Sequence, residues 1–307
     1  MSVLSFQLDI IKWLQENGSS LWDSIWSTIT MIGESYFAIV IIAFIYWLVD
    51  KKLGQKFVYI IAGSQVINGS IKGLVKAPRP FQNTEGYDII NKRPSTATGY
   101  SFPSGHTQSV STIMSFLAWH IKKHWLTIIS VVMIVLVAVS RMYLGAHYPI
   151  DVLVGGILGV LIAIFGSILY DKQKDPKKLV LFTIVVFLPF AIFYIFQFNP
   201  YNYDFFKMYG MLIGFYLGFL FEDKYVKFEL NIPLWKKIVR YVVGLILVIG
   251  VYLGLSSLFG MFAPTDEVIN VLPGQVVLTD IMSLIRYCIV TFIAIGAYPW
   301  IFKKFNF

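Results

Sequence analysis

Long apolar segments alternate with short polar ones along almost the whole chain. Many of the apolar segments are about 20 residues long, which is the length that a helix needs to cross the hydrocarbon core of a bilayer. We interpret nine of them as membrane spans, over residues 23–49, 54–75, 105–121, 125–144, 150–170, 179–198, 206–222, 238–259 and 280–302. The pattern therefore predicts an all-α protein, a polytopic transmembrane helical bundle of about nine spans.

A shorter segment precedes the first span. Residues 5–17 place Phe6, Ile10 and Leu14 at helical spacing with polar residues between them, and an Asn-Gly pair follows. This pattern fits a short helix in the membrane interface, and it fits the start of the first span equally well.

The polar connections set the expected orientation. Most of the 25 Lys and Arg residues fall in one set of alternating connections, from Lys51 to Lys304. Positively charged loops face the cytoplasm, so we expect a multi-pass protein of the cell membrane with its N-terminus outside and its C-terminus inside. The same rule accounts for the net charge of +8, and no nucleic-acid partner is expected.

Composition excludes the soluble classes of protein. Hydrophobic residues make up 57% of the chain and charged residues only 14%, and the mean hydropathy is +0.70. The single cysteine, Cys288, lies in an apolar segment, so no intrachain disulfide can form and a buried free thiol is expected.

Three polar stretches interrupt this apolar background at the ends of predicted spans. They are Lys72–Pro80, Pro103–His106 and Ser140–Asp151. Ionisable groups at the edge of a membrane are costly, which makes them functional candidates. The predicted topology places all three stretches on the non-cytoplasmic side, where they could form one site beneath the long connection over residues 76–104.

Lys72 and Arg79 are the cations of the first stretch. They are seven residues apart, or two helical turns, but prolines on both sides of Arg79 disfavour a helix there. A guanidinium held in this way suits bidentate binding of phosphate oxygens. The alternative is a pair of snorkelling side chains that face lipid headgroups.

The second stretch has the features of a helix start. Ser104 is a preferred N-cap residue, Gly105 allows close approach to the backbone, and His106 would point from the first turn. Helix N-termini bind anions through unpaired backbone N–H groups. Taken alone, however, the stretch is explained better by a capped helix with a solvated histidine.

The third stretch pairs an imidazole with a carboxylate. His147 and Asp151 are four residues apart, the spacing at which helical side chains meet. A carboxylate beside an imidazole fixes its tautomer and supports nucleophilic catalysis. Pro149 lies between them, so the turn that joins them is expected to be the first turn of the next span. Arg141 enters an apolar span and needs a partner there, for which a phosphate is suitable.

The remaining histidines do not favour a metal site. His120 and His124 share the four-residue spacing, but they fall in a basic connection on the predicted cytoplasmic side, where a solvated loop is favoured. Asp151 is the one certain carboxylate of the main site. Two imidazoles, one carboxylate and several cations suit phosphate chemistry, and neither a metal nor another cofactor is expected.

Together the three stretches resemble the type-2 phosphatidic acid phosphatase superfamily, which also includes the vanadium haloperoxidases and glucose-6-phosphatase. The pattern is Lys-x6-Arg-Pro, then Pro-Ser-Gly-His, then Ser-Arg-x5-His-x3-Asp, and the matching region covers about residues 23–170. The resemblance implies that His147 is the nucleophile, that Asp151 orients it, and that His106 is the general acid and later the base. It also implies that the phosphate is bound by Lys72, Arg79, Ser104, the Gly105 backbone and Arg141.

The function implied by this resemblance is that of a metal-independent membrane phosphatase working through a phosphohistidine on the non-cytoplasmic face. Its substrate would be a lipid phosphate or diphosphate: undecaprenyl diphosphate, phosphatidate, phosphatidylglycerophosphate or a sphingoid-base phosphate. A phosphotransferase using the same histidine and a glucose-6-phosphatase-like sugar phosphatase are alternatives. A lipid transporter is the weakest alternative, to which Asp280 and Arg286 in or near the ninth span would point.

We expect two parts within one membrane domain. Residues 1–175 would form the interfacial helix and a catalytic core of five spans, and residues 176–307 would add a four-span bundle. The expected partners are the lipid phosphate substrate and the surrounding membrane lipids. The four extra spans could widen lipid access, mediate a homodimer or enlarge the bundle.

Overall fold

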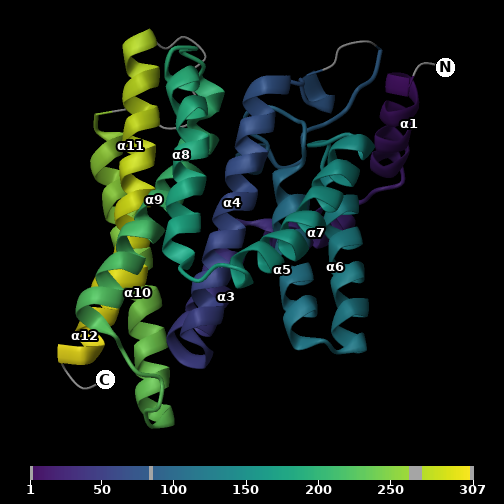
Figure 1. Cartoon of the computed structure of the whole chain (residues 1–307). Coiled ribbons are helices and arrows are strands. Elements are labelled where there is room, and N and C mark those ends of the chain that lie inside the picture. The colour runs from purple at the N-terminus through teal and green to yellow at the C-terminus, as the bar shows by residue number, and fades with distance from the viewer. Residues whose placement is uncertain (1–2, 83–85, 263–271, 305–307) are drawn as a thin grey trace. The chain divides into compact units, whose positions relative to one another are not determined.

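The computed structural model describes residues 3–82, 86–262 and 272–304. Within these ranges the secondary structure is helical, without strands, and the predicted all-α class is confirmed (Figure 1). The α-helices are α1 (Val3–Glu16), α2 (Ser20–Ile29), α3 (Ser35–Phe44), α4 (Lys51–Val75), α5 (Gly105–Ile121), α6 (His124–Tyr143), α7 (Pro149–Asp171), α8 (Pro176–Ile195), α9 (Tyr203–Phe221), α10 (Leu234–Gly260), α11 (Pro273–Phe292) and α12 (Tyr298–Lys304). Shorter helical turns are η1 (Thr30–Gly33), η2 (Ile45–Val49), η3 (Pro80–Gln82), η4 (Pro94–Thr96), η5 (Pro200–Asn202), η6 (Glu222–Val226) and η7 (Ile293–Ala297).

Six helical segments are long and apolar enough to cross a membrane. They are His124–Tyr143, Pro149–Asp171, Pro176–Ile195, Pro200–Val226, Leu234–Gly260 and Pro273–Lys304. A seventh would be the pair Ser20–Gly33 and Ser35–Val49, which is bent by 48°. The predicted count of nine spans is therefore not confirmed. The orientation of the termini stays a prediction.

The two remaining predicted spans do form helices, α4 and α5, but they carry more polar residues than the other spans. Asn68 on α4 donates a hydrogen bond to Gln108 Oε1 on α5, over 2.8 Å. Both residues are buried. These two helices therefore use polar contacts for part of their packing, and α5, at 17 residues, is also shorter than the six segments above.

The N-terminal segment forms a helix of its own. α1 ends at Glu16, and α2 begins at Ser20 with Ser19 as its N-cap, the Ser19 side chain accepting from the Trp22 backbone N–H. Of the two interpretations of residues 5–17, the separate helix is the one that the structure contains.

The chain divides into two compact units. One comprises residues 1–38 and 67–168, and the other comprises residues 39–66 and 169–307. The predicted division after residue 175 stays a prediction. All of the candidate site residues lie in the first unit.

Glycines on α7 let it approach α5 closely in the first unit. A Cβ atom at Gly155 would lie 2.6 Å from the Ser104 carbonyl oxygen, and one at Gly159 would lie 2.5 Å from Ser111 Cβ. The Ser104 backbone N–H also donates to the carbonyl oxygen of Asp151 over 3.0 Å. The starts of α5 and α7 are thereby fixed side by side, which brings the second and third polar stretches together.

In the second unit, α9 and α11 pack against each other along their length, again through small residues. A Cβ at Gly210 or Gly214 on α9 would collide with the α11 backbone. Beside this contact lies an aromatic cluster that includes Tyr194, Phe205 and Phe206. The unit is therefore held by close helix packing and ring contacts.

Candidate active site

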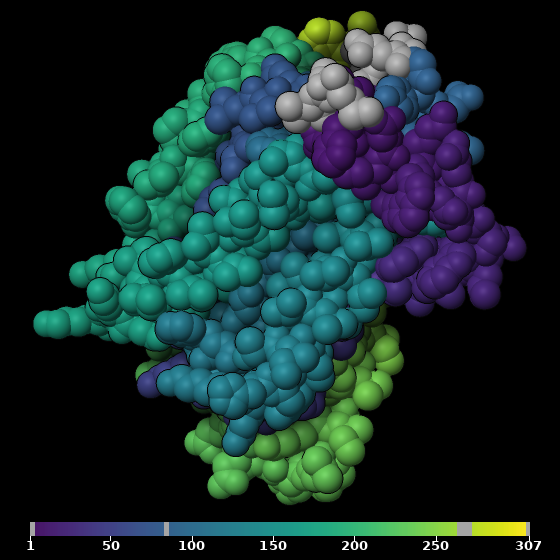
Figure 2. All heavy atoms as spheres, turned by 90° about the vertical axis from the view of Figure 1, so that its right-hand side faces the viewer, coloured from purple at the N-terminus to yellow at the C-terminus, as the bar shows by residue number. Residues whose placement is uncertain are grey.

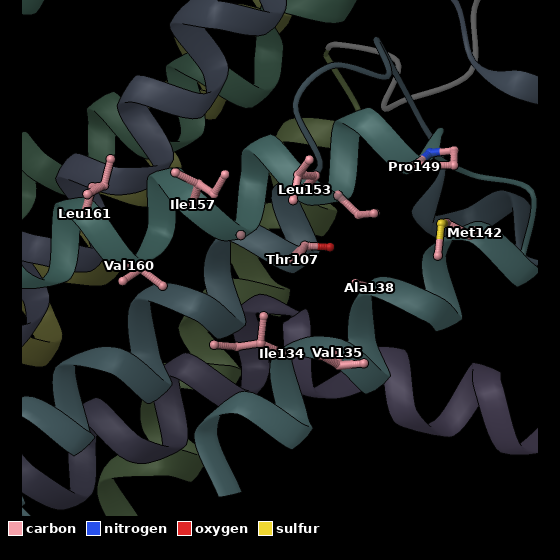
Figure 3. Close-up of a pocket in the computed structure, with 12 residues that line it drawn as sticks. Thr107, Ile134, Val135, Ala138, Met142, Pro149, Leu153, Ile157, Val160 and Leu161 are labelled. Carbon is pink, nitrogen blue, oxygen red and sulfur yellow. The ribbon is translucent and has the colours of Figure 1, made fainter. Parts of the chain in front are cut away.

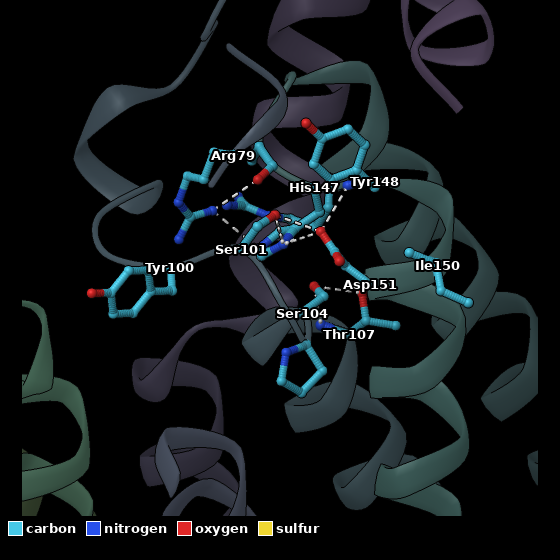
Figure 4. Close-up of polar contacts among 12 residues, drawn as sticks. Arg79, Tyr100, Ser101, Ser104, Thr107, His147, Tyr148, Ile150 and Asp151 are labelled. Carbon is cyan, nitrogen blue, oxygen red and sulfur yellow. Dashed lines mark hydrogen bonds and ion pairs between the residues drawn. The ribbon is translucent and has the colours of Figure 1, made fainter. Parts of the chain in front are cut away.

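His147 lies in the short segment between α6 and α7, and its side chain is buried. Its Nδ1 atom is 3.4 Å from Asp151 Oδ2, and its Nε2 atom is 3.3 Å from Arg79 Nη1 (Figure 4). A guanidinium can only donate, so Nε2 must be the acceptor. The proton of the neutral imidazole therefore sits on Nδ1, facing the carboxylate.

Asp151 lies in the first turn of α7, as expected from Pro149, which begins the helix. Its Oδ2 atom accepts from Ser101 Oγ over 2.5 Å and from the Tyr148 backbone N–H over 2.9 Å. A carboxylate in this position is also favoured by the dipole at the helix N-terminus. The carboxylate that faces His147 is thus held by two donors.

Arg79 lies outside α4, which ends at Val75, in agreement with the expected effect of its flanking prolines. Its guanidinium is buried and donates to three carbonyl oxygens, those of Thr98 at 2.5 Å, Gly99 at 2.8 Å and Ala146 at 2.8 Å. These acceptors come from two segments that are far apart in sequence. Arg79 therefore joins the long connection before α5 to the His147 segment.

Lys72 is in the last turn of α4, and its Nζ atom donates to the Tyr100 carbonyl oxygen over 2.5 Å. The connection over residues 76–104, expected to cover the site, thus supplies backbone acceptors to both Lys72 and Arg79. Burial, followed by the positive charges of Arg79 and Lys72, lowers the pKa of His147 well below its ordinary value of 6.5. The imidazole is therefore neutral, as a nucleophile must be.

The Pro-Ser-Gly-His stretch begins α5 as predicted. Ser104 is its N-cap and accepts from the Thr107 backbone N–H over 3.4 Å, and Gly105 is the first helical residue. His106 follows in the first turn and packs closely against Gly33 of η1. A Cβ atom at Gly33 would lie 2.8 Å from the Cβ atom of His106. Its Nε2 atom is buried and has no hydrogen-bond partner within the described ranges.

Arg141 is completely buried in the last turn of α6. Its Nη1 atom donates to the Oγ1 atoms of Thr30 at 3.2 Å and Thr96 at 3.1 Å, and its Nη2 atom donates to the Thr96 carbonyl oxygen at 2.9 Å. The predicted need for a partner is met in part by these oxygens. Its Nε atom has no partner in the part of the chain that the structure describes.

The structure thus brings Arg79, His147 and Asp151 into direct contact. Lys72 and Ser104 are attached to the same cluster through the backbone of Tyr100 and Asp151. The positive charge of Arg141 acts on the His147 imidazole as well. The described residues contain no group of three or more His, Cys, Asp or Glu side chains placed to hold a metal ion.

Sequence reasoning missed Ser101, Thr30 and Thr96. Ser101 donates to Asp151 and its Oγ atom is 3.4 Å from His147 Nδ1. It lies two residues before Pro103, and this closeness to the second polar stretch is the one signal that could have pointed to it. Thr30 and Thr96 carry no such signal, because only the folded chain places them at Arg141.

An apolar groove lies beside the site, between α6 and α7 (Figure 3). Its volume is about 620 Å³, and Thr107 on α5 is its one polar lining residue. Thr107 Oγ1 is 3.0 Å from Ser104 Oγ. The groove also reaches Pro149 and Val152, on either side of Asp151 in sequence. It therefore adjoins the start of α5 and the start of α7.

Comparison with known proteins finds two family matches, over successive parts of the chain. The PAP2 superfamily matches residues 53–175, and the family described as PAP2 superfamily phosphatase, transmembrane extension, matches residues 206–307. The two matches together cover well over half of the chain.

Individual relatives are similar over shorter lengths. An undecaprenyl-diphosphatase of Sulfolobus acidocaldarius is 29% identical over 180 residues, which are 57% of this chain and 84% of that protein. Phosphatidylglycerophosphatase B of Bacillus subtilis is 38% identical over 74 residues, 21% of this chain and 36% of that protein. The crystal structure of a transmembrane PAP2 type phosphatidylglycerolphosphate phosphatase from Bacillus subtilis is 26% identical, with a TM-score of 0.48, and covers 56% of this chain and 88% of that one.

The expected resemblance is therefore confirmed by both family matches and by sequence relatives. The apolar helices agree with the multi-pass membrane protein that these families imply. The chain belongs to the PAP2 superfamily, with the superfamily domain over residues 53–175 and the transmembrane extension of its phosphatases over residues 206–307.

Proposed function

We propose that this membrane phosphatase hydrolyses a lipid phosphate or diphosphate monoester through a phosphohistidine, on the non-cytoplasmic face. The observation that carries the proposal is the buried, neutral imidazole of His147, which lies between the Asp151 carboxylate and the Arg79 guanidinium. Asp151 faces Nδ1 and leaves Nε2 as the atom with a lone pair. Arg79 lies where a phosphoryl group approaching Nε2 would place an oxygen.

In the first step, the Arg79 N–H turns from His147 Nε2 to a phosphoryl oxygen, Nε2 attacks phosphorus with the lone pair this frees, and the bond from phosphorus to the leaving oxygen breaks. His106 gives a proton to that oxygen. The imidazole becomes positively charged, and Asp151 stabilises it through Nδ1–H. Preorganised cations are most effective where charge develops, so Arg79 and its neighbouring cations bind the phosphoryl oxygens in the transition state.

In the second step, water attacks phosphorus and His106 takes a proton from it. The bond from phosphorus to Nε2 breaks, which releases inorganic phosphate and returns His147 to its neutral form. The Nε2 atom of His106 has no hydrogen-bond partner among the residues that the structure describes, which supports this role because it leaves the atom available to the substrate. The positive charge at the site comes from side chains, so the proposal requires no metal ion.

The apolar groove supports a lipid as the substrate. Its wall of aliphatic side chains suits a hydrocarbon chain, and it adjoins Thr107, next to the proposed phosphate-binding start of α5. The undecaprenyl-diphosphatase relative makes a polyprenyl diphosphate the first compound to test. Phosphatidylglycerophosphate follows, because the shorter match is to a phosphatidylglycerophosphatase.

The test is phosphate release by the purified protein in detergent, with EDTA present. The compounds are undecaprenyl diphosphate, phosphatidylglycerophosphate, phosphatidate, a sphingoid-base phosphate and glucose 6-phosphate. We expect the wild type to release phosphate from a lipid, His147→Ala to lose this activity, and the control His124→Ala to retain it. His124 begins α6 and belongs to no part of the proposed site.

Three results would contradict the proposal. Release that persists in His147→Ala would exclude this histidine as the nucleophile. Release that stops with EDTA would show a required metal ion. Release from glucose 6-phosphate alone would exclude a lipid substrate. Separately from these three, a compound that lost its phosphoryl group only when an acceptor lipid was present, with the acceptor phosphorylated and no free phosphate formed, would show a transfer and not a hydrolysis.

A further inference from the structure

Helix α1 presents one face to the segment that carries His147. Gln7, Ile11 and Gln15 follow each other at a spacing of four residues, which places them on one side of the helix. Leu8 and Ile11 are completely buried on this side, in a cluster that includes Tyr148. Trp13, on another side of α1, is 63% exposed. Figure 2 shows the N-terminal residues, in purple, on the surface of the first unit beside its teal residues.

Gln15 holds the chain before His147. Its Nε2 atom donates to the Tyr143 carbonyl oxygen at 2.9 Å and to the Ile90 carbonyl oxygen at 2.7 Å. Its Oε1 atom accepts from the Ile90 backbone N–H at 3.0 Å. One amide thereby joins the end of α6 to the connection that precedes α5.

The turn after Tyr143 is shaped around this contact. Gly145 has a φ of +71°, a conformation that suits glycine. A Cβ atom there would lie 3.0 Å from Gln15 Nε2 and would also meet the Ile90 carbonyl oxygen. The Gln15 amide therefore lies against the space that a side chain at residue 145 would need.

Gln7 holds the chain after His147. Its Oε1 atom accepts from the Ile150 backbone N–H at 3.0 Å, in the first turn of α7. This N–H is one of those that a helix leaves unpaired at its N-terminus. Gln7 thus caps α7 from outside, one residue before Asp151.

Tyr148 completes the connection between α1 and the site. Its ring packs in the cluster with Leu8 and Ile11, while its backbone N–H donates to Asp151 Oδ2. Displacing Tyr148 would therefore move the carboxylate that faces His147.

We propose that α1 positions His147 and Asp151, and that Gln7 and Gln15 are positioning residues for the reaction. The proposal rests on the proposed function, because it requires His147 as the nucleophile. Helix α1 holds the segment over residues 143–150 at three places. These are the Tyr143 carbonyl oxygen, the Tyr148 ring and the Ile150 backbone N–H. A displacement of about 1 Å at a reacting atom can lower a rate about 100-fold, so these anchors affect turnover without contact with the substrate.

The two glutamines allow a sharp test, because they use their amides differently. Gln7 only accepts in its contact with Ile150, so Gln7→Glu keeps the contact and adds a negative charge that suits a helix N-terminus. Gln7→Met removes the acceptor at nearly the same volume. Gln15 donates to two carbonyl oxygens, so both Gln15→Glu and Gln15→Met remove these bonds.

We expect Gln7→Met, Gln15→Met and Gln15→Glu to lower kcat about 10-fold or more, with KM changed less than about 2-fold. Gln7→Glu should retain the wild-type kcat. The matched control is Glu16→Met, an exposed position at the end of α1 whose ion pair with Lys12 is also exposed. Thermal unfolding of each variant shows whether it is folded.

Hydrogen exchange over residues 143–150 gives a second measurement that needs no activity. The Ile150 amide should exchange faster in Gln7→Met than in Gln7→Glu. Wild-type kcat in both Met variants, or equal loss in Gln7→Met and Gln7→Glu, would overturn the proposal. If the wild type hydrolysed none of the compounds, the proposed function would be wrong. Independently of this, unchanged amide hydrogen exchange over residues 143–150 in the Met variants would overturn the anchoring by α1.

Discussion

At the scale of single residues, the site depends on how Asp151 is held. Two donors, Ser101 Oγ and the Tyr148 backbone N–H, meet at the same carboxylate oxygen that faces His147. Ser101 is buried completely. Its hydroxyl therefore orients the carboxylate in a place that water does not reach.

Ser101→Ala should lower kcat about 10-fold, because a hydrogen bond to a charged group contributes about 1.5–3 kcal/mol. The Tyr148 N–H still holds the carboxylate, so the variant should keep some activity. Steady-state phosphate release measures the change. The control is Ser130→Ala, because Ser130 is also buried and its hydroxyl donates to the carbonyl oxygens of Met114 and Leu126. Equal turnover in both variants would mean that Ser101 plays no part in orienting Asp151.

The pH dependence follows from the lowered pKa of His147. The reaction needs the neutral imidazole, which is lost only when the pH falls through the folded-state pKa. Burial and the neighbouring cations lower that pKa well below 6.5, so the acidic limb of kcat/KM should lie below pH 6.5. The stability of the fold also decreases as the pH falls. Below pH 6.5 the unfolded chain binds a proton at His147 and the folded chain does not, so the free energy of unfolding becomes smaller.

Removing a positive charge tests the cause of this shift. Arg79→Gln should raise the pKa of His147 and move the acidic limb to higher pH, in addition to lowering kcat. The measurement is a pH profile of kcat/KM for both proteins. A wild-type limb at or above pH 6.5 would be incompatible with a neutral, buried nucleophile at this position.

At the scale of elements, the close packing of α7 on α5 determines where Asp151 lies. Gly155→Ala would place a Cβ 2.6 Å from the Ser104 carbonyl oxygen, where a backbone atom must shift. Overpacking of this kind costs about 1–3 kcal/mol. We expect a lower melting temperature and a lower kcat, because the start of α7 moves away from Ser104.

Gly63→Ala on α4 is the matched control for this prediction. Apart from the nearby backbone of α4 itself, no atom of the described residues lies within 4 Å of a Cβ at this position, so the substitution should stabilise the helix by about 0.5–1 kcal/mol. Thermal unfolding and phosphate release of both variants provide the measurement. If Gly155→Ala behaved like Gly63→Ala, the close approach of α7 to α5 would not constrain the site.

At the scale of the whole molecule, the transmembrane extension contains a buried carboxylate of its own. Asp280 on α11 is 1% exposed, and neither of its carboxylate oxygens has a hydrogen-bond partner within the described residues. Asp280→Asn should leave phosphate release at the wild-type level, because the proposed site lies in the other unit. An amide costs less to bury than a charge, so the melting temperature should not fall.

Ser283→Ala, at a buried position one turn later on α11, is the control for Asp280→Asn. Loss of phosphate release in Asp280→Asn, with an unchanged melting temperature, would contradict this prediction. It would give the extension a part in the reaction and revive the transport alternative. The roles expected for the extra spans, including dimerisation, stay open predictions.

Much of the local structure could be predicted from the sequence. Ser104 caps α5, Pro149 begins α7, and α4 ends before Arg79, each because a short-range preference of one residue decides it. The spacing of the three polar stretches also indicated the superfamily. The count of nine spans stays unconfirmed, because α4 and α5, which the sequence pattern also marks as spans, carry polar residues in their mutual contact and α5 is only 17 residues long.

The helices, their caps and the candidate residues follow from the amino-acid order alone, because these depend on neighbours within a few positions. The contacts of Ser101 with Asp151 and of Gln15 with Tyr143 arise only on folding, because they join residues 50 and 128 positions apart. Such contacts leave no periodic pattern, since a serine or glutamine in a polar segment looks the same with or without a distant partner. Close packing of helices through glycine brings these partners together, and that packing is a property of the folded chain.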